Sequence, residues 1–189
     1  NTFSSDIYVS DNTFNVNGTG TTDVDGDITG NVAFGNDGTL DLAADQQIDG
    51  AVDNATGSNG AGSLILGDGS TVTGTVGSTH SLKDIQLNNS NTLALDESWN
   101  TESLSLNGSG QVDVDAALSA DVDFDTDTTL DVASGNQING SVDNATGNDN
   151  KGTLKLNGNN TVTGDIGSSN SLNQLTSAGS SNTTLQGTV

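Results

Sequence analysis

The chain has 189 residues, of which 30% are hydrophobic and 3% aromatic, too few to fill the thick core of an ordinary globular domain. Acidic residues number 25 against 3 basic ones, so the net charge is −22. This charge excludes nucleic acids and anionic lipid surfaces as partners, because both are bound through Lys and Arg. The absence of cysteine excludes disulfides, thiolate metal sites and cysteine nucleophiles.

Short runs of alternating apolar and polar residues follow one another along the chain, and this pattern indicates half-buried strands rather than helices or disorder. The clearest runs are 40–42, 64–66, 93–95, 104–106, 112–114 and 122–124. Gly, Asn, Asp and Ser separate them, as in Gly67-Asp68-Gly69 and Asn157-Gly158, and these residues favour tight corners. No run of 18 apolar residues occurs, so we expect no membrane insertion by this segment and any export signal or anchor to lie outside it. The chain is interpreted as a stretch of a longer protein.

An internal repeat covers nearly the whole chain. Residues 53–57 (DNATG) recur at 143–147, 90 residues later, and TVTG at 71–74 recurs at 161–164. Such self-similarity indicates stacked units. We therefore expect two modules, 1–99 and 100–189, within one continuous solenoid.

The spacing of the strand runs predicts an all-β fold, a parallel β-helix. Leu40-x-Leu42 and Leu64-x-Leu66 lie 24 residues apart, the length of one three-sided coil. A coil needs only a thin apolar column inside, because each coil buries its apolar face on its neighbours. We expect Leu40 and Leu64 to stack, and each module to form roughly four coils. The alternative is two tandem immunoglobulin-like β-sandwiches of about 90 residues each. The sequence has no proline and does not duplicate its Trp99 or Tyr8, which favours the β-helix.

The pattern VDNATGxxxxGxLxLxGxxTVTGxIG occurs at 52–77 and 142–167, with Val76 at the position of Ile166 and the turn at Asp68-Gly69 shifted by one residue. In these residues the chain resembles the passenger repeats of rickettsial surface-antigen autotransporters of the outer membrane protein B type. The resemblance implies a right-handed parallel β-helix on the bacterial cell surface that acts in adhesion or as a coat.

Aspartates form the only pattern with possible chemistry. They alternate with other residues at Asp23, Asp25 and Asp27 and again at Asp121, Asp123, Asp125 and Asp127. In a strand they would share one outer face, where their oxygens could attract calcium. The twelve-residue calcium loop is not matched, since Ile28 and Phe34 stand where Gly and Glu are required. An acidic, solvated face that prevents edge pairing is the simpler interpretation.

The other candidates favour structural roles. Pectin-cleaving β-helices resemble one another in combining clustered Asp with His, Lys or Arg, whereas this chain has one histidine, His80, and no arginine. His80 is expected at a solvated corner, and we expect no enzyme activity. The Asn-Ala-Thr triplets at 54–56 and 144–146 match a glycosylation acceptor but also suit a corner. Trp99 is expected to cap a local core rather than to bind a sugar or a partner. Lys83, Lys151 and Lys155 are scattered and form no basic patch.

Two functions fit these features. The first is an extracellular adhesin or passenger stalk whose partner is a receptor on a host or neighbouring cell. The second is a self-assembling surface layer or filament subunit, with copies joined through solenoid ends or bridging divalent ions. No cofactor is expected, and calcium is the ion that a specific aspartate site would bind.

Overall fold

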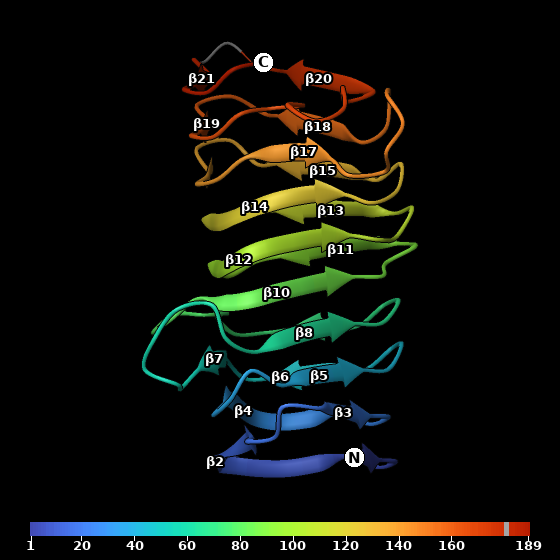
Figure 1. The fold of residues 1–189 in the computed structure, drawn as a ribbon, viewed down its shortest axis with the longest axis vertical. Coiled ribbons are helices and arrows are strands. Elements are labelled where there is room, and N and C mark those ends of the chain that lie inside the picture. The colour runs from blue at the N-terminus through green and yellow to red at the C-terminus, as the bar shows by residue number, and fades with distance from the viewer. Residues whose placement is uncertain (180–181) are drawn as a thin grey trace.

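The computed structural model describes residues 1–179 and 182–189. Its strands stack into a three-sided β-solenoid that rises along one axis from the N-terminus to the C-terminus (Figure 1). Every strand pairing within the described residues is parallel. The predicted parallel β-helix is therefore confirmed, and the alternative of two sandwiches is wrong because immunoglobulin-like sheets are antiparallel.

Three sheets form the walls of the solenoid. The first contains β1 (Thr2–Phe3), β3 (Thr21–Val24), β5 (Thr39–Leu42), β8 (Ser63–Leu66), β10 (Leu82–Leu87), β12 (Trp99–Leu106), β14 (Leu118–Phe124), β16 (Gln137–Ile138), β17 (Val142–Asn144), β19 (Thr161–Val162) and β21 (Thr184–Leu185). The second contains β11 (Thr92–Leu95), β13 (Gln111–Val114), β15 (Thr129–Val132), β18 (Thr153–Leu156) and β20 (Gln174–Ser177). The third contains β2 (Ile7–Val16), β4 (Ile28–Phe34), β6 (Gln47–Asp49), β7 (Val52–Asn54) and β9 (Thr71–Val72).

The core is a set of apolar columns parallel to the axis. Leu40 lies directly beneath Leu64, as expected from their spacing, and the column continues through Ile85 and Leu104. These side chains are fully buried, and each buried Leu or Ile contributes about 1.5–3 kcal/mol of hydrophobic stabilisation. A second column has nine rungs: Phe14, Val32, Val52, Val76, Trp99, Leu118, Ile138, Val162 and Leu185. With rungs about 4.8 Å apart, the rod is about 38 Å long.

The three sides of a coil differ in width. In one coil of the first module, the narrow side buries Ile28 alone, whereas the other two sides each bury a pair of residues, Val32 with Phe34 and Leu40 with Leu42. The corner after the narrow side is tight. A Cβ on Gly50 would collide with the Gly30 carbonyl oxygen of the coil below, and one on Gly140 would collide with that of Ala120. Glycine therefore ends the narrow side because the stacked backbones leave no room for a side chain.

The 90-residue repeat does not contain a whole number of coils. In the column of Val32, the residue four coils higher is Leu118. The residue that lies 90 positions before Leu118 is Ile28, which belongs to the side of the coil before Val32. Likewise Val122, the equivalent of Val32, stacks on Leu104 in the column of Leu40. Each module is thus four coils plus one side, and the second module is turned by one side relative to the first.

This turn places equivalent loops on different edges of the rod. The loop at 55–62 joins β7 to β8, and its repeat equivalent at 145–152 joins β17 to β18. The first leaves the rod on the left of Figure 1 and the second on the right. Strand β12 begins at Trp99, at the expected junction of modules 1–99 and 100–189. The module boundary itself stays a prediction.

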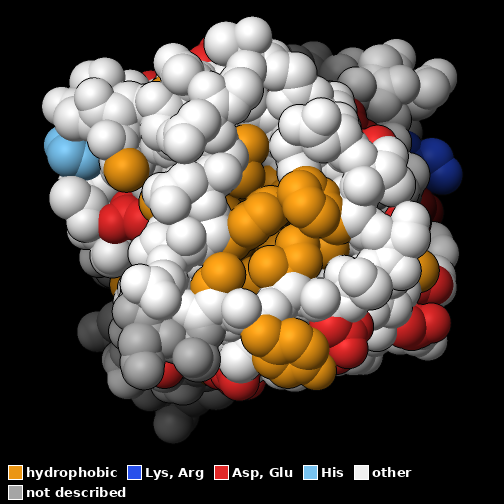
Figure 2. Space-filling model, turned by 90° about the horizontal axis from the view of Figure 1, so that it is seen from below, with side chains coloured by type: hydrophobic (Ala, Val, Ile, Leu, Met, Phe, Trp, Pro, Cys, Tyr) orange, Lys and Arg blue, Asp and Glu red, His pale blue; other side chains and the backbone are white. Residues whose placement is uncertain are grey.

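The N-terminal end of the rod is open. Figure 2 shows hydrophobic side chains gathered in the middle of that end and ringed by polar groups. Phe3 is 39% exposed and packs edge to face on Phe14 with ring centroids 5.5 Å apart. The C-terminal end has an apolar hollow lined by Ile166, Leu172 and Leu175. None of the described residues forms a helix that could span a membrane.

Candidate functional site

The first aspartate group lies at the start of the second coil. Asp23 points outward from β3, and Asp25 and Asp27 occupy the corner between β3 and β4. Each carboxylate accepts a hydrogen bond from a different neighbour. Asp23 accepts one from the Thr2 hydroxyl (3.2 Å), and Asp25 accepts one from the Ser4 hydroxyl (3.3 Å). Asp27 accepts one from the backbone N–H of Gln47 (2.8 Å), so these aspartates connect adjacent coils.

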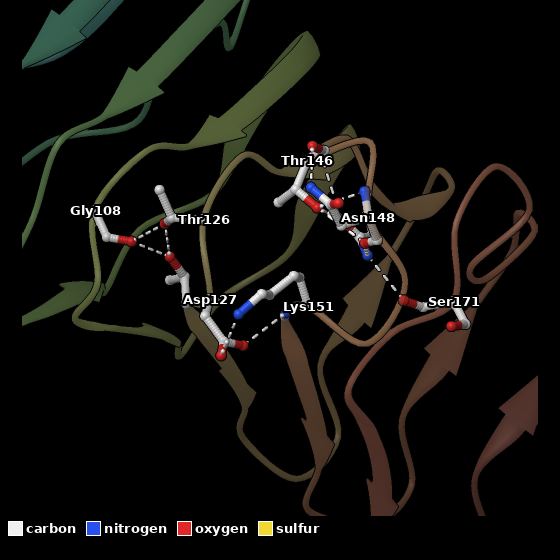
Figure 3. A network of polar contacts seen from close by, with 10 residues as sticks. Gly108, Thr126, Asp127, Thr146, Asn148, Lys151 and Ser171 are labelled. Carbon is white, nitrogen blue, oxygen red and sulfur yellow. Dashed lines mark hydrogen bonds and ion pairs between the residues drawn. The ribbon is translucent and has the colours of Figure 1, made fainter.

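The second group differs from its expected alignment. Asp121 and Asp123 lie on β14 and face outward, but β14 ends at Phe124, so Asp125 and Asp127 lie in the corner that follows. The expectation of four carboxylates along one strand face is therefore wrong for the last two. Thr126 and Thr128 explain the bend, because both hydroxyls donate to the Gly108 carbonyl of the coil below (Figure 3).

Two carboxylates of this group are bound by the next coil. Asp121 accepts hydrogen bonds from the backbone N–H and the hydroxyl of Ser141, both at 2.8 Å. Asp127 accepts one from the Gly152 N–H at 3.1 Å and pairs with the Lys151 ammonium at 3.5 Å (Figure 3). These contacts favour a role in holding successive coils together.

Asp123 lies among several negative charges. Burial raises the pKa of its carboxyl, and the charges of Asp125, Asp143, Asp121 and Asp84 raise that pKa further. Burial also raises the pKa of Asp125. This face of the first sheet thus concentrates negative charge, which attracts cations without a specific site.

The seven aspartates do not form a recognisable metal centre. Within the part of the chain that the structure describes, no group of three or more His, Cys, Asp or Glu side chains is arranged to hold a metal ion. Calcium binding by Asp23, Asp25, Asp27, Asp121, Asp123, Asp125 or Asp127 stays a prediction.

Each lysine is paired with an aspartate. Lys83 donates to Asp37 at 2.8 Å, and this hydrogen bond lowers the pKa of the Asp37 carboxyl. Lys155 lies 3.5 Å from Asp131. The partners of Lys83 and Lys151, Asp37 and Asp127, are repeat equivalents. Since these pairs are exposed, they contribute little stability, and their effect is to neutralise three of the carboxylates.

The Asn-Ala-Thr triplets are corners with a buried asparagine. Asn54 is fully buried on top of Phe34. Its amide Nδ2 donates to the carbonyls of Ser58 and Ser81, both at 2.8 Å, and its Oδ1 accepts from the N–H and the hydroxyl of Thr56 at 2.9 and 2.7 Å. All the hydrogen-bonding capacity of the amide is therefore used.

Asn144 repeats this arrangement in the second module. It is also fully buried, donates to the carbonyls of Asn148 and Ser171, and accepts from Thr146 (Figure 3). A glycan on Nδ2 of either asparagine would break these bonds and would have no space. The expected turn chemistry, and not glycosylation, accounts for both triplets.

His80 and Trp99 occupy structural positions. His80 lies in a corner in which the Asp53 carboxylate accepts hydrogen bonds from the backbone N–H groups of Thr79 and His80. Trp99 is 2% exposed and stacks between Val76 and Leu118 in the core. The expectation that Trp99 completes a local core is confirmed.

Over 148 residues the chain is 37% identical to Outer membrane protein A of Rickettsia rickettsii. The matched segment is 77% of this chain but spans only 6% of that protein's length. No protein-family model and no solved structure matches the chain. The chain is thus similar to part of a rickettsial outer membrane protein. That protein is of type A, whereas the repeat pattern indicated type B, so the assignment to type B stays a prediction.

Proposed function

We propose that this chain is a non-catalytic stalk segment of an extracellular bacterial surface protein that acts in adhesion. The similarity to a rickettsial outer membrane protein over 77% of the chain carries the proposal, because it links this sequence to the cell surface. The solenoid supports it, since stacked coils form a stiff rod that projects its side faces away from an anchoring point.

The charge distribution suits such a rod. Outward aspartates line the sheets, and among the described side chains three aspartates, Asp37, Asp127 and Asp131, have a lysine partner. The negative faces would keep neighbouring rods apart and block pairing along strand edges. The partner would be a receptor on a host or neighbouring cell that is neutral or basic at the contact, because an acidic one would be repelled.

Cell binding by the purified chain tests the proposal. Fluorescent beads coated with the chain would be counted on a monolayer of cultured animal cells. An equally acidic protein of similar size would coat the control beads. We expect several-fold more bound beads with the chain than with the control. Equal binding of the two would contradict an adhesive role.

A self-assembling coat is the second candidate, and the carboxylates on the outer face of β14 favour it, because divalent ions could bridge such faces of neighbouring copies. Light scattering after size-exclusion chromatography, with and without calcium, separates the two functions. A monomer under both conditions supports the stalk, whereas ordered polymers support the coat.

A further inference from the structure

Because the second module is rotated by one side relative to the first, the wall of the rod contains a seam, where, in the part of the chain that the structure describes, the facing strands of two successive coils are not paired. Strand β9 is the last strand of the third sheet, and β11 is the first strand of the second sheet one coil later. Among the described residues, no strand pairing joins β9 to β11. The reason is that β9 belongs to a narrow side, where Val72 stacks on Ile48, whereas β11 belongs to a wide side that buries Leu93 and Leu95.

A groove of about 340 Å³ opens at this seam, within the size range of small-molecule sites. Thr71 and Thr73 line it from β9 and the residue after it, and Thr92 and Ala94 line it from β11. Val72 and Leu93 supply apolar surface. Because β9 and β11 are not paired with each other among the described residues, their facing edges add backbone groups to the groove wall.

A buried asparagine forms part of the groove wall. Asn89 lines the groove and is only 3% exposed. Its Nδ2 donates to the carbonyls of Asn91 and Gln111 at 2.8 and 3.1 Å. These two bonds fix the Asn89 side chain, so this part of the wall keeps its shape.

We propose that the seam groove binds a neutral sugar. Hydroxyl and amide side chains next to small apolar surfaces match the alternating O–H and C–H groups of a saccharide ring. A phosphate or an acidic sugar would be repelled, because the only charged side chain in the lining is Asp96 and the chain carries a net charge of −22. The carboxylate of Asp96 would accept hydrogen bonds from sugar hydroxyls.

This inference deepens the proposed adhesive function, since sugars cover the cells that an adhesin would meet. The test is a printed array of neutral oligosaccharides and their sialylated counterparts, probed with the labelled full chain. We expect binding to at least one neutral oligosaccharide and weaker binding to its sialylated form. No binding, or a preference for sialylated forms, would overturn the proposal.

Two variants locate the binding on the chain. Ala94→Trp fills the groove and should weaken binding at least tenfold. Thr176→Trp is its matched control, because Thr176 occupies the same outward column of the second sheet, four rungs further along and outside the groove. Unchanged binding by Ala94→Trp, or equal loss in both variants, would place the sugar elsewhere and overturn the proposal.

Asp96→Ala guards against misfolding of the tryptophan variant. Asp96 is exposed in the loop after β11, so its loss should leave the circular dichroism spectrum unchanged while weakening sugar binding several-fold. The cell-binding assay then separates the two proposals. Bead binding that survives Ala94→Trp would leave the adhesive role standing without the groove.

Discussion

Replacing Asn54 with alanine tests whether one buried amide holds the loop at 55–62. The variant loses four hydrogen bonds, two donated to the Ser58 and Ser81 carbonyls and two accepted from Thr56. Each such bond has a net value of about 1 kcal/mol. We therefore expect the free energy of unfolding to fall by about 4 kcal/mol, a large fraction of the total for a domain.

Urea unfolding followed by far-ultraviolet circular dichroism measures this change. Asn88→Ala is the matched control, because Asn88 is an exposed asparagine between two coils, and surface substitutions cost within about 0.5 kcal/mol. Thr56→Val should have an intermediate effect of about 1 kcal/mol, since it removes one hydroxyl donor. If Asn54→Ala cost no more than Asn88→Ala, the amide would not be holding the loop.

Three further predictions follow from contacts and charges. Gly62→Ala should lower the melting temperature well beyond Gly57→Ala, because both glycines have positive φ but only at Gly62 would a Cβ collide with the Phe34 ring. Equal shifts in the two variants would refute the packing of Gly62 on Phe34. The pKa of the Asp123 carboxyl is higher in the folded than in the unfolded chain, so its ionised form lowers the free energy of unfolding at pH values above the folded pKa. Protonation removes this destabilisation as the pH falls through the folded pKa toward the pKa of the unfolded chain. Asp123→Asn should therefore be more stable than the parent chain at neutral pH, and the difference should shrink in acid; a constant difference would contradict this. Calcium should raise the melting temperature no more than sodium chloride of equal ionic strength, because charge screening accounts for its effect. A larger rise lost in Asp25→Asn would instead establish a specific site.

The strand columns could be predicted from the sequence because apolar alternation and coil length are local properties. Leu40 and Leu64 stack since both begin similar runs one coil apart. The turn between modules could not be predicted in this way. In the column that contains Leu40, successive residues are 18 positions apart from Thr22 to Leu40 but 24 positions apart from Leu40 to Leu64. A 90-residue repeat is therefore compatible with four coils or with four coils plus one side.

The candidate sites show the same limit. Asn54 lies in a corner as predicted, but its burial on Phe34 depends on which residues stack beneath it. For the aspartates, alternation alone indicated one long strand from Asp121 to Asp127. Thr126 and Thr128 end that strand by bonding to Gly108 of the previous coil, a contact about 20 residues away in sequence. The seam groove likewise arises from the meeting of a narrow and a wide side, which no local pattern reveals.

If the chain forms a single solenoid whose second module is turned by one side, equivalent loops lie at a fixed distance, and measuring that distance tests this arrangement. Because the chain lacks cysteine, spin labels can be attached at Ser58→Cys and Asn148→Cys, which are exposed repeat equivalents. Four rungs separate the labels by about 20 Å along the axis. If the second module is rotated by one side of the solenoid, the labels are also displaced across the axis by roughly 16 Å, the length of about five strand residues. Double electron–electron resonance should then show one narrow distance distribution centred at about 26 Å or more. A narrow peak near about 20 Å would place both loops on one edge of the rod. A broad distribution would indicate two units joined by a hinge. Either result would contradict a single solenoid with a rotated second module.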